Sequence, residues 1–97
     1  AAERETRLRE ESRRLSEARD ALRRGDAAGA LALLDEMRRK FPQGTLAQER
    51  ETLAVEALTR SGRTDEAKAR AASFKDAYPE SPHGVRVDAF AGDAGSK

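Results

Sequence analysis

The stretch Gly25–Pro42 reads GDAAGALALLDEMRRKFP, and a degenerate copy follows as Gly62–Pro79, GRTDEAKARAASFKDAYP. In both copies an alanine follows the first glycine by five residues, and an aromatic residue and a proline close the copy. Each landmark of the second copy lies 37 residues after its equivalent in the first. A helix-ending glycine and a helix-stopping proline that recur at a fixed period predict an all-α stack of helix-turn-helix units. The paired landmarks are Gly25, Ala30, Phe41 and Pro42, and then Gly62, Ala67, Tyr78 and Pro79.

Length and composition limit the chain to one small domain. It has 97 residues, of which 37% are hydrophobic and 38% are charged, so we expect helices that pack closely through alanine instead of a large core. The net charge of +1 disfavours a dominant attraction to nucleic acid or to an anionic membrane. There is no cysteine, which excludes disulfides and thiolate sites. No apolar run approaches the ~20 residues that cross a bilayer, so we expect no direct membrane insertion.

Four helices are predicted in a domain that covers residues 1–82. The first segment contains no glycine or proline and is rich in strong helix formers. Asp26 is well placed to cap the second helix, Thr45 with Gln48 forms a possible capping box for the third, and Thr64 or Asp65 suits the fourth. The predicted helices span about residues 3–24, 27–40, 46–60 and 65–77.

One apolar face is expected on each helix. Leu8, Leu15 and Leu22 recur at intervals of seven on the first helix, which fits either an elongated first helix of a repeat pair or the tail of a coiled coil. Val55 is expected on a flank of the third helix. The expected buried sets of the later helices are Ala30, Leu31, Leu34, Met37 and Phe41, then Leu46, Leu53, Ala54, Ala57 and Leu58, and then Ala67, Ala71, Phe74 and Tyr78.

Residues 83–97 are expected to add only a short C-terminal cap and a tail. Gly84, Gly92 and Gly95 disfavour a long fifth helix, although Pro82 suits the start of a short one. We expect Val85, Val87 and Phe90 to pack back onto the domain and the final GDAGSK to be disordered.

The repeat resembles the tetratricopeptide repeat, with about three residues added to the usual ~34. The resemblance covers roughly residues 12–82. Arg14 and Glu51 stand where that family commonly has an aromatic pair, so the chain resembles a divergent member. The equivalent positions are Ala18 and Val55, Gly25 and Gly62, Ala30 and Ala67, Met37 and Phe74, and Pro42 and Pro79.

The resemblance implies a short right-handed solenoid of two antiparallel hairpins with a long first helix. The FPQGT and YPESP endings are similar to bacterial envelope versions of the repeat, which favours a periplasmic or envelope location over the cytoplasm. Two repeats fall short of the ~3 that a solenoid usually needs, which points to missing flanking repeats, a cap or self-association.

The resemblance also implies a protein or peptide partner on the face of the first helices, with no cofactor, no metal and no catalysis. Arginine forks suit carboxylates, so an acidic segment or a C-terminal carboxylate is the expected ligand. The alternative is that Arg19 or Arg23 pairs with Glu56 across the helices. On the repeat numbering the partner-binding face holds Ser12, Arg19, Leu22 and Arg23 from the first helix, and Glu49, Thr52, Glu56 and Arg60 from the third; Arg19, Leu22, Arg23, Glu56 and Arg60 are its central residues.

Other functions have less support in the sequence. His83 is the only histidine and lies in a loop sequence, so no triad or histidine-rich metal site is expected. The arginines of residues 3–24 alternate with glutamates and lack stacking aromatics, which disfavours nucleic-acid binding. A homodimer formed through the long first helix or the alanine-rich fourth helix remains the alternative function.

Overall fold

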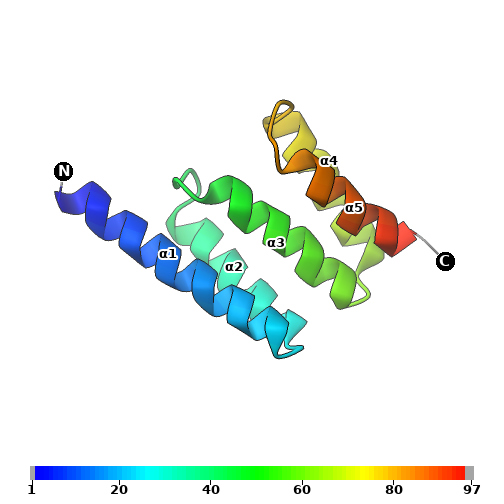
Figure 1. The fold of residues 1–97 in the computed structure, drawn as a ribbon, viewed down its shortest axis with the longest axis horizontal. Helices are drawn as coiled ribbons and strands as arrows, with labels where there is room; N and C mark the ends of the chain where they lie inside the picture. The colour runs from blue at the N-terminus through cyan, green and yellow to red at the C-terminus, as the bar shows by residue number, and fades with distance from the viewer. Residues whose placement is uncertain (1, 96–97) are drawn as a thin grey trace.

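The computed structural model describes the backbone of residues 2–95 and the side chains of residues 2–92. These residues form five α-helices and no strand (Figure 1). The first helix has 22 residues, and the next three have 14 each. The helices are α1 (Ala2–Arg23), α2 (Ala27–Lys40), α3 (Ala47–Arg60), α4 (Thr64–Ala77) and α5 (Gly84–Gly95).

Two glycines turn the chain between the helices of each hairpin. Gly25 and Gly62 have φ of 86° and 76°, a left-handed conformation that glycine adopts without the steric cost that a Cβ brings. The amide of Asp26 then donates to Ala21 O at 2.8 Å, and that of Arg63 donates to Leu58 O at 2.9 Å, which closes α1 and α3 with the same motif. The glycine turns inferred from the sequence are therefore confirmed.

The ends of α2 and α4 also repeat. Phe41 and Tyr78 have almost the same backbone angles, with φ −132° and ψ 65° in one and φ −133° and ψ 65° in the other. Because a residue before proline is disfavoured in the helical region, both helices end there. The following turns match as well: Gly44 N donates to Phe41 O at 3.1 Å, and Ser81 N donates to Tyr78 O at 3.1 Å.

The helices pack as antiparallel neighbours in two layers, with α1, α3 and α5 in one layer and α2 and α4 behind (Figure 1). Each helix packs against the next along the chain; α3 also packs along α5, whereas α1 makes only a few contacts with α3. The shortest dimension of the molecule is 19 Å, which is about two helix diameters. These contacts fit an arrangement of helical hairpins.

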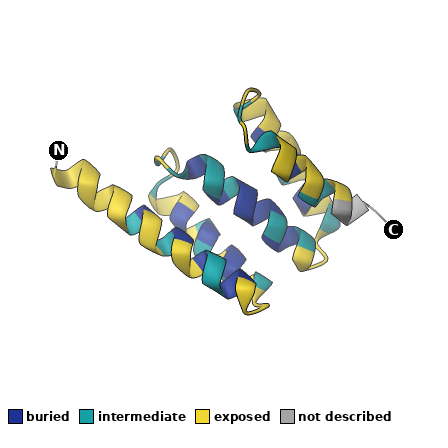
Figure 2. Cartoon of the chain, in the orientation of Figure 1, coloured by how far each residue is buried: buried dark blue, intermediate teal, exposed yellow. Residues whose placement is uncertain are grey.

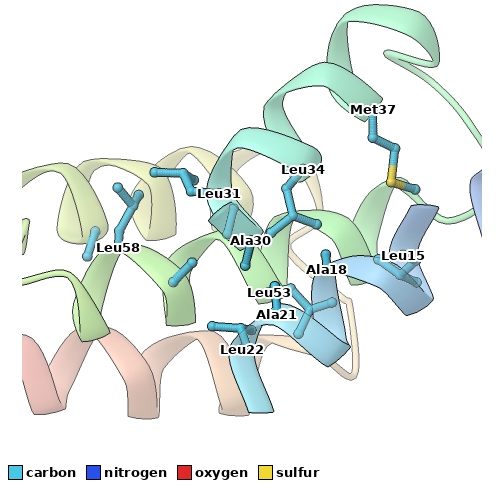
Figure 3. Packing of buried hydrophobic residues seen from close by; sticks show 13 residues of the cluster. Leu15, Ala18, Ala21, Leu22, Ala30, Leu31, Leu34, Met37, Leu53 and Leu58 are labelled. Carbon is cyan, nitrogen blue, oxygen red and sulfur yellow. The ribbon is translucent and has the colours of Figure 1, made fainter. Parts of the chain in front are cut away.

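Leucine and alanine form the larger core cluster, between α1, α2 and α3 (Figures 2 and 3). Ala18, Ala30 and Ala54 are fully buried, so the helices approach closely, and Leu34 and Met37 fill the space that remains. Truncating Leu34 to alanine would cost about 2–5 kcal/mol on the usual scale for core leucines. A second cluster joins α3, α4 and α5 through Val55, Ala71, Phe74 and Val87.

The structure corrects the expected C-terminal cap. Residues Gly84–Gly95 form a helix of 12 residues, so the expectation of disorder was wrong for Gly92–Gly95. Val87 is fully buried and Phe90 is half-buried, as expected, but Val85 is 80% exposed and does not pack back. The remainder of the expected disordered tail, residues 96–97, lies outside the described residues.

Two predicted helix caps are also corrected. The expected box of Thr45 and Gln48 does not form, because α3 begins at Ala47 and its N-cap, Leu46, has no side-chain hydrogen bond. Thr64 is the first residue of α4, and the N-cap is Arg63, again without a side-chain bond. Asp26 caps α2 as predicted, since its Oδ1 accepts from Gly29 N at 2.8 Å.

Candidate functional site

The face formed by α1 and α3, which we call the first-helix face, joins the two helices through arginine side chains. Arg19 donates to the carboxylate of Glu49, and Arg60 donates to the main-chain oxygen of Leu22 at 3.2 Å. Arg60 also pairs with Glu56, one turn earlier on α3, at 2.6 Å. The first-helix face thus carries charged side chains that are paired with each other or with the main chain and that connect α1 to α3.

The structure brings together most of the residues expected on this face. The guanidinium of Arg60 lies at the carbonyl of Leu22, which stands three residues after Arg19 and one before Arg23. Arg23 pairs with Asp20 on its own helix, and Glu56 pairs with Arg60. The expected pairing of Arg19 or Arg23 with Glu56 is therefore wrong, and the ion pair that crosses from α1 to α3 on this face joins Arg19 to Glu49.

Two residues expected at the surface of this face are buried. Leu22 is 5% exposed and belongs to the main core, and Thr52 is fully buried, with its hydroxyl donating to Gln48 O at 2.9 Å. Both side chains pack inside the domain, so a partner on this face would meet Arg19, Arg23 and Arg60 before it met either of them. The binding role of these three arginines stays a prediction.

A second charged cluster, which sequence reasoning missed, joins α2, α3 and α4. Arg70 donates to both oxygens of Glu51, at 2.8 and 3.2 Å, and to Asp35 Oδ1 at 3.0 Å. Arg50 bonds Glu51 at 2.8 Å and the main-chain oxygen of Phe41 at 2.9 Å. Burial raises the pKa of Glu51, but the hydrogen bonds from Arg70 and Arg50 outweigh it, and the pKa lies below its ordinary value of 4.5.

The charged side chains of this cluster are largely shielded from solvent. Arg50 is 3% exposed, and the side chains of Glu51 and Arg70 are 13% and 14% exposed. A buried charge is tolerated only where it is paired and hydrogen-bonded, and each of these is. The signal in the sequence was Glu51 at a core position, which implied a buried cation without identifying Arg70.

Glu11 on α1 holds the loop before α3. Its Oε1 accepts from Thr45 N and its Oε2 from Leu46 N, both at 3.3 Å, and the residue is 2% exposed. The carboxylate thereby supplies the cap that the loop's own side chains do not. In the second repeat Gln48, 37 residues later, accepts from the hydroxyl of Ser81 at 2.6 Å, so the same helix position again reaches the following loop.

An open pocket of about 530 Å³ lies between the first turns of α1 and the α2–α3 loop. Arg4 and Arg7 line one side, and Lys40, Phe41 and Pro42 line another. Lys40 is bonded to Glu10 at 3.3 Å, whereas Arg4 and Arg7 form no ion pair among residues 2–92. We call this the overhang pocket, because α1 extends past the end of α2 here (Figure 1).

Within the described part of the chain, no group of three or more His, Asp or Glu side chains is arranged to hold a metal ion. None of the five described helices is both long and apolar enough to cross a membrane. No protein-family model, no curated protein and no solved structure matches this chain.

Proposed function

We propose that this chain is a non-catalytic protein-interaction module, a divergent tetratricopeptide-like repeat that binds a peptide or protein partner on the first-helix face. The repeated backbone geometry supports the repeat assignment, because Gly25 and Gly62 share a left-handed turn and Phe41 and Tyr78 share one helix ending, each pair 37 residues apart. Helical repeats of this kind present their first helices to extended partners.

The observation that carries the binding proposal is the exposure of the three arginines on one face. The side chains of Arg19, Arg23 and Arg60 are 41%, 70% and 52% exposed, although each is paired. Exposed ion pairs contribute only about 0–1 kcal/mol, so a carboxylate on a partner can replace Asp20 as the acceptor for Arg23 at little cost. Guanidinium groups bind carboxylates through two parallel hydrogen bonds, which suits an acidic segment or a C-terminal carboxylate.

The test is a selection of peptides from a displayed random library, followed by calorimetric titration of a selected peptide. We expect acidic sequences, and we expect the triple variant Arg19→Glu, Arg23→Glu, Arg60→Glu to lose the peptide. The matched control reverses three exposed arginines outside the face, Arg24, Arg38 and Arg39. Equal binding by the wild type and the first triple variant would reject this face as the site, and equal loss in both variants would reject specific recognition.

Self-association is the second candidate function, and the exposed apolar side chains are the surface available for it. Among residues 2–92, the large apolar side chains classed as exposed are Leu8 at 39% and Val85 at 80%. Val85 stands 37 residues after Gln48 and 74 after Glu11, the two residues that hold a following loop. Val85 therefore occupies the third equivalent position, but it is exposed. A second copy of the chain or another partner could cover it.

A further inference from the structure

α1 begins earlier in the chain than the 37-residue repeat requires, and we call its extra residues, 2–9, the overhang. α3 begins at Ala47 and α5 begins 37 residues later at Gly84, so the equivalent start in the first repeat is Glu10. Residues 2–9 nevertheless continue α1, and every one of them is exposed (Figure 2). In the second repeat the corresponding residues 39–46 end α2 and form a loop.

The overhang also continues the buried stripe of α1, but with different chemistry. Leu22, Ala18, Leu15 and Glu11 face the core at helical spacing, and Arg4, Arg7 and Leu8 extend the same face beyond the end of α2. No described helix covers this end of α1, so Arg4 and Arg7 line the open pocket. The pocket wall has an apolar part, which is formed by the half-buried Phe41 and by Pro42.

The charges that line the overhang pocket favour an anion. Arg4, Arg7 and Lys40 stand against one carboxylate, Glu11, and both of its oxygens are already bonded to the amides of Thr45 and Leu46. Lys40 is shared with Glu10. Arg4 and Arg7 lie one turn apart and make no ion pair within residues 2–92, so their guanidinium groups can bind neighbouring carboxylates without breaking an existing pair.

We infer that the overhang pocket is a second binding site, which takes a carboxylate-bearing peptide segment of a partner. Two acidic groups of the segment pair with Arg4 and Arg7, and an apolar side chain between them lies against Phe41 and Pro42. The site is separate from the first-helix face, and it holds even if that face binds nothing.

The probe is a labelled octapeptide in which glutamate and leucine alternate, with a glutamine–leucine octapeptide as the uncharged control. Fluorescence anisotropy at about 150 mM salt, where exposed charges beyond about 8 Å are screened, compares three proteins. Arg4→Gln with Arg7→Gln removes the two cations of the pocket. Arg9→Gln with Arg24→Gln removes the same net charge from α1 and the turn after it, at positions that do not line the pocket.

We expect the pocket variant to bind the glutamate peptide at least tenfold more weakly than the wild type. The control variant should bind it with an affinity within about twofold of the wild type, because a bidentate pair between arginine and carboxylate is specific in geometry. Equal losses in both variants would show attraction by net charge alone and would overturn the inference, as would unchanged binding in the pocket variant. Neither arginine bonds another described side chain, so circular dichroism should be unchanged in both variants.

Amide chemical shifts locate the peptide independently of the variants. A peptide in the overhang pocket perturbs the amides of Gly44, Thr45 and Leu46, which border the pocket or bond Glu11. Perturbations confined to residues around Arg19 and Arg60 would overturn the inference and instead place the peptide on the first-helix face. The two proposals therefore fail separately.

Discussion

The carboxylate of Glu11 occupies the space that a side chain at Gly44 would need. A Cβ built on Gly44 would overlap both oxygens of that carboxylate, and no other neighbour is so close. The φ of Gly44 is not positive, so an added side chain would conflict with the Glu11 carboxylate and not with the backbone conformation, and that carboxylate would have to move. One glutamate thus determines both the cap of the α2–α3 loop and the residue type that the loop can carry.

Glu11→Ala removes the carboxylate that accepts from two loop amides, and Gly44→Ala pushes that carboxylate away from them. We predict that each substitution destabilises the domain by about 1–3 kcal/mol in urea unfolding. The double variant should lose little more stability than Glu11→Ala alone, since without the Glu11 carboxylate an alanine at position 44 overlaps nothing. Two costs that simply add would contradict the contact, because independent sites add within about 0.5 kcal/mol.

The glycines give two predictions of opposite sign. Alanine at Gly25 or Gly62 must adopt a positive φ, which costs about 1–2 kcal/mol, although nothing lies within 4 Å of the added Cβ. Alanine at Gly92, inside α5 and also in open space, should instead stabilise the domain by about 0.5–1 kcal/mol. Thermal unfolding followed by circular dichroism measures all three, and a stabilising Gly62→Ala would contradict the assigned turn.

Local signals predicted most of the helices. The bounds 27–40 of α2 agree with the prediction, and those of α1, α3 and α4 differ by one residue at one end or at both. Gly25, Gly62 and Asp26 act within a few residues of themselves, where sequence rules are strong. The glycines of residues 84–95 outweighed the start signal of Pro82 in the prediction, although the period of 37 residues that links Ala47 to Gly84 places a helix start there.

The charged contacts were not predictable in the same way. Glu11 bonds loop amides 34 and 35 residues away, and Arg70 bonds Asp35 at a separation of 35. Such partners are chosen by packing in three dimensions, and a chain rich in arginine and glutamate offers many equivalent pairs. The face of Arg19, Arg23 and Arg60 was located by the repeat, but its internal pairing with Glu49, Asp20 and Glu56 was not.

The low pKa of Glu51 predicts an acid-sensitive part of the stability. A carboxyl group whose pKa is lowered by folding stabilises the folded state above its unfolded pKa, here about 4.5, and that stability is lost as the pH falls through the lower folded value. Arg70→Met should cost about 2 kcal/mol at neutral pH, because Glu51 keeps only Arg50 as a partner.

The pH dependence separates this pair from the other carboxylates. Hydrogen bonds from Arg14 and Arg63 lower the pKa values of Glu10 and Glu66, which also favours acid unfolding, but these groups are the same in both proteins. The difference in unfolding free energy between the wild type and Arg70→Met should therefore narrow as the pH falls below about 4.5 toward the lower pKa that Glu51 has in the folded wild type. Urea unfolding at several pH values measures the gap; a constant gap would mean that Arg70 acts by packing alone. Arg39→Met, at an exposed residue of α2, is the control.

Sedimentation equilibrium over a hundredfold dilution should give the monomer mass of 10.6 kDa throughout, with unchanged helicity. The exposed large apolar residues of the described chain, Leu8 and Val85, lie on α1 and α5, at opposite sides of the molecule (Figure 1). A stable interface needs about 800 Å² from each partner, which two separate side chains do not supply. A dimer that loses helicity as it dissociates would instead favour self-association. Val85→Asp and Leu8→Asp then identify the interface, because only the substitution inside it abolishes the dimer.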